Sequence, residues 1–106
     1  MKESYEQGVS KVPLIGKTIG KFFDEIAAKH GGGEALVSVF EKKRYTYSEF
    51  LGAVNSSARA LMALGVKKGE RVGIWSTNCA AWTILQFATA KTGAILVNIN
   101  PAYRLH

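Results

Sequence analysis

The strongest pattern of apolar and polar positions in this chain runs through residues 47–65. Its apolar residues recur at intervals of three and four, the spacing of one helix face: Phe50, Val54, Ala58, Leu61 and then Leu64 or Gly65. The polar residues between them are expected to face water: Asn55, Ser56 and Arg59. Thr46 and Glu49 precede the pattern with the separation of a capping box, and Gly65 with Val66 behind it is typical of a left-handed helix end. The pattern therefore predicts an amphipathic helix between Thr46 and Gly65.

Shorter patterns predict the remaining elements of secondary structure. Apolar residues that share one face behind Thr18 predict a helix to about His30, and three glycines end it. Apolar runs rich in branched residues predict strands, and a longer apolar run predicts one more helix. The expected strands span residues 35–40, 44–46, 71–76 and 94–99, and the expected last helix spans residues 80–92 behind a polar start at 76–78.

The order of these elements indicates an α/β fold. The segments 35–40 and 44–46 are joined by a charged turn, so they predict a short hairpin. The segments 71–76 and 94–99 are apolar enough to be covered on both faces, as in the interior of a parallel sheet. With the helix 80–92 between them, they predict adjacent parallel strands joined by a right-handed crossover.

Composition and charge narrow the function classes. With 106 residues, of which 47% are hydrophobic and 21% charged, the chain fits one small globular domain. The formal net charge is +6, which permits attraction to phosphate-bearing partners. The basic clusters at 42–44 and 67–68 nevertheless lie in predicted turns, without the interleaved aromatic residues of a nucleic-acid surface. Nucleic-acid binding is therefore not expected.

The cysteine content and the apolar runs indicate the cellular compartment in which the chain is expected. Cys79 is the single cysteine, so no internal disulfide can form and a cytoplasmic setting is the expectation. The first residues are polar and charged with no apolar run behind them, which is unlike a secretory signal. The most apolar segment, 79–90, is interrupted by polar residues and is shorter than the roughly 20 residues that cross a bilayer. No transmembrane segment is expected.

Two glycine-containing motifs could bind phosphate, and each has a structural explanation. Residues 16–18, Gly-Lys-Thr, resemble the end of a phosphate-binding loop, but position 11 is lysine where that motif requires glycine. These residues are interpreted as a loop glycine and a helix cap. The glycines 31–33 follow a helix instead of opening one, so the helix dipole opposes an anion there. They are interpreted as a flexible helix exit.

The cysteine, histidine and tryptophan side chains give no active site either. Cys79 precedes a predicted helix, whose dipole could activate a thiol, but no spacing places His30 or His106 near it. A buried or half-buried structural cysteine is therefore favoured, and no set of zinc ligands is available. Trp75 and Trp82 are expected in the core. We assign no catalytic, cofactor-binding or metal-binding residue.

Four longer stretches, taken in order, resemble a known family. They are PLIGKTIG (13–20), RYTYSEF (44–50), GVKKGERVGIWSTNCAAW (65–82) and FATAKTGAILVNINPAY (87–103). Together they are similar to the opening of the AMP-forming acyl-CoA synthetases, in the adenylate-forming enzyme superfamily. The resemblance covers about Ser4 to His106, and the lead-in around Ser4-Tyr5 and Pro13-Leu14 is most similar to the branch that acts on fatty acids.

The resemblance implies a two-step, ATP-dependent ligase. In this family a carboxylic acid attacks the α-phosphate of ATP to give an acyl-adenylate and pyrophosphate, and the thiol of coenzyme A then displaces AMP. Mg²⁺ accompanies the ATP, and the substrates are a fatty acid, ATP and CoA. Such a site must stabilise charge on phosphoryl oxygens with backbone N–H groups, cations and metal.

The resemblance also implies that this chain is an amino-terminal fragment, inactive on its own. The phosphate loop, the metal-site residues, the ribose-binding aspartate and the catalytic lysine of the family all lie beyond the point where this sequence ends. The expected organisation is a lead-in arm at 1–17 and an incomplete AMP-binding amino-terminal domain at 18–106. No cofactor is expected to bind the fragment, and its uncovered sheet is expected to make it self-associate.

Two alternatives remain open at the level of sequence. One is a fragment of another adenylate-forming enzyme, such as a peptide-synthetase adenylation domain or a luciferase-like enzyme. The other is a self-standing binding or regulatory module of flavodoxin-like design. That module would need a finished sheet, whereas the sequence predicts two good parallel strands and a hairpin.

Overall fold

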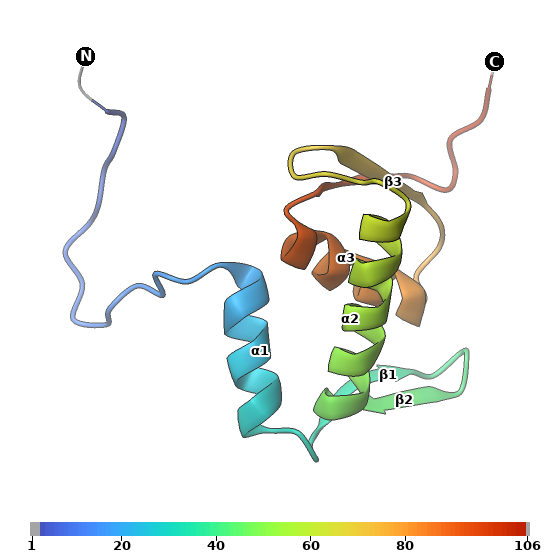
Figure 1. Ribbon diagram of the computed structural model, residues 1–106, viewed down its shortest axis with the longest axis horizontal. Helices are drawn as coiled ribbons and strands as arrows, with labels where there is room; N and C mark the ends of the chain where they lie inside the picture. The colour runs from blue at the N-terminus through green and yellow to red at the C-terminus, as the bar shows by residue number, and fades with distance from the viewer. Residues whose placement is uncertain (1–2, 106) are drawn as a thin grey trace.

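The structure is a computed structural model that describes residues 3–105, which form three helices and four strands (Figure 1). In chain order the elements are α1 (Ile19–Lys29), β1 (Glu34–Ser38), β2 (Lys43–Thr46), α2 (Tyr47–Ala63), β3 (Arg71–Trp75), α3 (Ala80–Thr92) and β4 (Ile95–Ile99). Every predicted element is present, with ends that differ from the prediction by no more than two residues. None of these helices combines the length and the apolar character that a bilayer span needs.

The helix boundaries follow the local signals in the sequence. Thr18 caps α1 by accepting a hydrogen bond from the Lys21 N–H, and Thr46 and Glu49 form the predicted capping box of α2. At the other end of α2, Gly65 adopts φ 87°. The N–H groups of residues 65 and 66 there donate to the carbonyls of residues 62 and 61, at 3.0 and 3.1 Å. This is a Schellman motif, as the glycine and the following valine predicted.

The strands form two separate pairs. β1 and β2 are antiparallel, with an irregularity between Glu34 and Leu36. β3 and β4 are parallel, from the pair Arg71 and Ile95 to the pair Trp75 and Ile99, and α3 connects them. The α/β fold, the hairpin and the parallel strand–helix–strand unit are therefore confirmed.

The parallel strands are covered on one face within the described residues, although their apolar pattern indicates cover on both, and this agrees with the uncovered sheet expected of a fragment. The residues on the outer face remain exposed: Trp75 60%, Ile95 48%, Val97 40% and Ile99 36%. Figure 1 shows α2 and α3 on the same side of the strand pair. A single crossover helix covers one face of a sheet, so a second layer is needed for the other. The same geometry corrects the expectation that Trp75 belongs to the core.

The core lies between the three helices. Its buried apolar residues come from all of them: Phe23, Ala27, Phe50, Val54, Ala58 and Ala88. Lys91 of α3 bonds to both other helices. Its Nζ lies 2.5 Å from Asp24 Oδ1 on α1 and 2.6 Å from Asn55 Oδ1 on α2. Asn55 was expected to face water, but it is half-buried because its side-chain oxygen accepts a hydrogen bond from the Lys91 ammonium group. Leu64, expected as one candidate on the buried face, is 81% exposed because α2 ends one residue before it.

Candidate functional site

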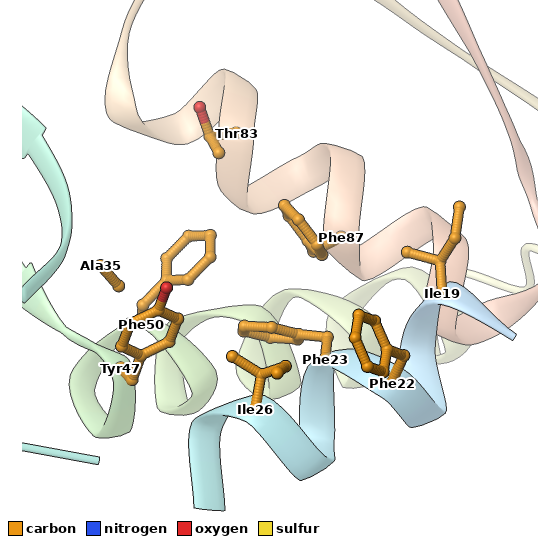
Figure 2. Close-up of a pocket in the computed structure, with 9 residues that line it drawn as sticks. All are labelled: Ile19, Phe22, Phe23, Ile26, Ala35, Tyr47, Phe50, Thr83 and Phe87. Atoms are coloured by element: carbon orange, nitrogen blue, oxygen red, sulfur yellow. The ribbon is translucent and has the colours of Figure 1, made fainter. Parts of the chain in front are cut away.

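An apolar pocket lies where α1, α2, α3 and β1 meet (Figure 2). Its volume is about 330 Å³. The lining is built mainly from the inward faces of α1 and of the starts of α2 and α3: Ile19, Phe22, Phe23, Ile26, Ala35, Tyr47, Phe50, Thr83 and Phe87. The helical spacing of these residues follows from the same three-and-four periodicity that builds the core.

Three phenylalanine rings hold the three helices together at the pocket. The centroids of Phe23 and Phe87 are 4.8 Å apart, those of Phe23 and Phe50 are 5.4 Å apart, and those of Phe50 and Phe87 are 5.6 Å apart. These distances lie in the range of favourable tilted and edge-to-face contacts. Figure 2 shows one ring from each helix converging on the pocket, with Phe22 and Ile26 beside them on α1. The pocket wall is therefore largely aromatic where the three helices meet.

The chemistry of this pocket is limited to apolar contact. Among the residues that line it, Tyr47 and Thr83 carry side-chain hydroxyl groups and none is an acid, a base or a histidine. A triphosphate or a divalent cation requires cations, carboxylates or converging N–H groups, so the pocket does not fit ATP or Mg²⁺. Within residues 3–105, moreover, no three His, Cys, Asp or Glu side chains gather as metal ligands.

The two glycine motifs have structural roles. Thr18 is the N-cap of α1, and Lys17 pairs with Glu25 at 2.6 Å, so the Gly-Lys-Thr motif is a helix start and not a phosphate loop. In the segment 31–33, the carbonyls of the first and third glycines accept the N–H groups of Ser48 and Tyr47, at 3.1 and 2.9 Å. The segment therefore closes the loop onto the start of α2, which is more specific than the predicted flexible exit.

Cys79 lies at the N-cap of α3 and is half-buried, as the structural interpretation predicted. Its Sγ is 3.8 Å from Ser76 Oγ. His30 lies instead beside Tyr47, with ring centroids 6.2 Å apart, and His106 lies outside the described residues. Trp82 is half-buried. Where the structure describes these side chains, it brings no base to the thiol.

The cap of α3 comes from a residue that sequence reasoning missed. Residues 76–78 were expected to start this helix, but the N-cap residue is Cys79, and its side chain makes no capping hydrogen bond. Glu41, in the turn between β1 and β2, accepts the Ala80 N–H at 2.7 Å and the Ser38 hydroxyl at 2.6 Å. Because Glu41 lies 39 residues before Ala80, no local pattern could have indicated this contact.

A sequence profile described as AMP-binding enzyme matches residues 23–106 of this chain. The chain belongs to this family. The match extends over α2, α3 and all four strands, so it contains three of the four stretches that carried the predicted resemblance, while the stretch 13–20 lies before it. The aromatic pocket and the open parallel sheet are therefore features of an AMP-binding enzyme segment.

Curated relatives of this AMP-binding chain include acyl-CoA ligases. It is 41% identical over 101 residues to the human medium-chain acyl-CoA ligase ACSF2, mitochondrial, and 40% identical over 93 residues to the putative acyl-CoA synthetase YngI of Bacillus subtilis. These matches cover 95% and 88% of the chain but 16% and 17% of the relatives. The chain thus spans about a sixth of the length of the curated relatives it matches.

Solved structures of the same fold include a Mycobacterium tuberculosis fatty acyl CoA synthetase. The N-terminal domain of FACL13 from Mycobacterium tuberculosis matches with a TM-score of 0.78 at 32% identity, over 82% of this chain and 22% of that one. The artificially fused adenylation–PCP di-domain NpsA-ThdA from Klebsiella oxytoca matches with a TM-score of 0.75 at 27% identity, over 80% and 16%. Both confirm that the chain has the fold of the N-terminal domain of adenylate-forming enzymes.

Proposed function

We propose that this AMP-binding chain is the amino-terminal part of an ATP-dependent, AMP-forming fatty-acid–CoA ligase. Such an enzyme converts a fatty acid, ATP and CoA to acyl-CoA, AMP and pyrophosphate. The observation that carries the proposal is the 41% identity to medium-chain acyl-CoA ligases over 95% of the chain. The TM-score of 0.78 to a Mycobacterium tuberculosis fatty acyl-CoA synthetase supports it.

In this proposal the chain has a structural role in the longer enzyme. Its pocket has no charged lining residue, so binding of ATP, Mg²⁺ and CoA is assigned to the rest of the longer protein. Residues 18–106 form the first part of the AMP-binding domain, and residues 1–17 form an arm before it. The uncovered outer face of β3 and β4 is the surface on which the rest of that domain packs.

An activity assay of the isolated chain tests the proposal that it is inactive on its own. We expect no fatty-acid-dependent exchange between ATP and pyrophosphate, because the aromatic pocket has no charged lining residue that could stabilise charge on transferring phosphoryl oxygens. Exchange above a heat-treated control, abolished by a substitution within these 106 residues, would contradict the inactive-fragment proposal.

A hybrid enzyme tests the proposal that the chain is the amino-terminal part of an acyl-CoA ligase. In it, this chain replaces the aligned segment of the Bacillus subtilis acyl-CoA synthetase homologue. We expect the hybrid to form acyl-CoA, because the segment supplies the same scaffold. The matched control replaces the corresponding segment of the Klebsiella oxytoca adenylation protein. Activity of the adenylation hybrid alone would favour an adenylation-domain origin instead.

The compartment of the proposed ligase is the cytoplasm. The support for this location is that the fold requires no disulfide, since Cys79 is the single cysteine. The ACSF2 relatives carry the word mitochondrial in their names, so mitochondria are the competing location. Fractionation of cells that express the longer protein decides between the two, and recovery with mitochondria would contradict the proposal.

A further inference from the structure

The turn between β1 and β2 carries the most exposed aromatic side chain of the folded part of the chain. Phe40 is 98% exposed and its neighbour Val39 is 83% exposed. The turn is closed by a 3.1 Å hydrogen bond from the Lys42 N–H to the Val39 carbonyl. Figure 1 shows this hairpin projecting from the helices. We call residues 39–44 the hairpin tip.

Basic side chains follow the apolar ones in the hairpin tip. Lys42, Lys43 and Arg44 are consecutive and exposed. Glu41, the acid of the tip, turns inward: its carboxylate accepts the Ala80 N–H at 2.7 Å and reaches Lys43 Nζ at 3.4 Å. Arg44 pairs with a glutamate of β1 and keeps 70% of its side chain exposed. The outward surface of the tip is therefore apolar and cationic.

A shallow hollow of about 300 Å³ lies on this hairpin. It combines the same two chemistries, because aliphatic and cationic side chains both line it. Val37 stands directly opposite Arg44 in the register, and Val37 itself is 41% exposed. The lining residues are Val37, Ser38, Val39, Lys42, Lys43 and Arg44. Such a hollow offers both cationic and apolar side chains to one ligand.

The backbone at Lys42 supports a role beyond closing the turn. Its φ is 55°, and within residues 3–105 it is the single residue other than glycine with a positive φ. Glycine or asparagine is preferred where a hairpin turn needs this left-handed conformation. A lysine there accepts a conformational cost and adds a cationic side chain two residues after Phe40.

We propose that the hairpin tip binds the surface of an anionic phospholipid membrane. Phe40 and Val39 enter the boundary between headgroups and acyl chains, where a projecting apolar side chain leaves water. Lys42, Lys43 and Arg44 keep their cationic ends at the level of the lipid phosphates. The proposal does not depend on ligase activity.

The shape of the tip favours a membrane over a protein partner or a nucleic acid. A stable protein interface needs about 800 Å² on each partner, whereas the tip is six residues at the end of one hairpin. A nucleic acid would use stacking surfaces, but the apolar neighbours of Phe40 are the aliphatic Val39 and Val37. Aliphatic and cationic groups on one projection match the interface of an anionic bilayer.

Vesicle flotation of the 106-residue chain tests the proposal. Vesicles of phosphatidylcholine alone are compared with vesicles that also contain phosphatidylglycerol. We expect the chain to bind the anionic vesicles more strongly, with the difference reduced by added salt. Phe40→Ser is expected to weaken binding to them about tenfold. Lys42→Gly is expected to weaken it about fivefold while relieving the left-handed backbone, so unfolding cannot explain that loss.

Matched controls separate the tip from other exposed groups. Leu64→Ser removes an apolar side chain that is 81% exposed at the end of α2, and Lys11→Glu changes an exposed lysine of the arm. Both are expected to leave the preference for anionic vesicles unchanged. Equal binding of the parent chain to both vesicle types, or normal anionic binding by Phe40→Ser and Lys42→Gly, would overturn the proposal. A changed oligomeric state with unchanged flotation would indicate a protein contact instead, and would also overturn it.

Discussion

Glu41 connects the hairpin to the start of α3 at the scale of a single residue. Its Oε2 accepts both the Ser38 hydroxyl and the Ala80 N–H, and the carboxylate faces the positive end of the helix dipole. The Ser38 hydroxyl is the largest cause that lowers the Glu41 pKa from its ordinary value of 4.5, followed by the Ala80 N–H. One ionised side chain thus replaces the N-cap that the local sequence of α3 does not supply.

This arrangement predicts a pH-dependent contribution of Glu41 to stability. Because its folded-state pKa is lowered, the contribution is fully present above the unfolded-state value of 4.5 and is lost as pH falls through the folded-state pKa. We expect Glu41→Gln to lower the free energy of unfolding at neutral pH. Urea titrations followed by circular dichroism in dilute protein, from neutral to strongly acidic solution, measure the effect.

The control for this prediction is Glu6→Gln, at an exposed position in the arm. It is expected to change stability little at any pH. The difference between the parent chain and Glu41→Gln should shrink in acid, where both side chains are uncharged. Parallel stability curves over the whole pH range would show that the carboxylate charge does not support α3.

At the scale of elements, two helices end on glycines in the left-handed conformation. Gly65 after α2 has φ 87°, and Gly93 after α3 has φ 79°. A Cβ at position 65 would meet nothing within 4 Å, whereas one at position 93 would lie 3.0 Å from Lys68 Cγ. The two caps therefore share a backbone requirement but differ in the space around them.

This difference predicts unequal costs for the same substitution. Gly65→Ala is expected to lower the free energy of unfolding by about 1 kcal/mol, from the left-handed backbone alone. Gly93→Ala is expected to cost about 2 kcal/mol, because the side chain of Lys68 must also move. Urea unfolding of both variants gives the comparison.

Gly52 offers the opposite control, because it lies inside α2 with nothing within 4 Å of its Cβ position. Gly52→Ala is expected to stabilise the chain by about 0.5–1 kcal/mol. For the two caps, a larger loss of free energy of unfolding for Gly65→Ala than for Gly93→Ala would contradict the role given to Lys68.

At the scale of the whole molecule, the uncovered outer face of β3 and β4 predicts self-association. Trp75, Ile95, Val97 and Ile99 place exposed apolar surface beside the open edges of a two-stranded sheet. We expect concentration-dependent association in light scattering, together with fluorescence from a dye that binds apolar surface. Val97→Lys, at an exposed position in the middle of β4, is expected to reduce both signals.

Val9→Lys is the matched control, since Val9 is also exposed but lies in the arm. It is expected to reduce association less than Val97→Lys. A monodisperse monomer that binds no dye, with a sharp cooperative thermal transition, would contradict the prediction and would favour a self-standing module.

Local sequence patterns predicted the elements and the class of the fold because the forces behind them act over a few residues. The capping box at Thr46 and Glu49 and the Schellman motif at Gly65 follow from short spacings. The apolar runs of β3 and β4, with a helix between them, indicated the parallel pairing. The resemblance to AMP-forming acyl-CoA synthetases came from ordered longer stretches, and the family match confirms it. The absence of an assigned catalytic residue remains a prediction.

The tertiary structure alone decided which distant groups meet. It brought Glu41 to the N-terminus of α3, Lys91 to Asp24 and Asn55, and three phenylalanines from three helices to one pocket. It also left the apolar side chain of Trp75 60% exposed, outside the core. The physical reason is that periodicity defines which residues share a face, whereas burial depends on whether another layer of the molecule covers that face.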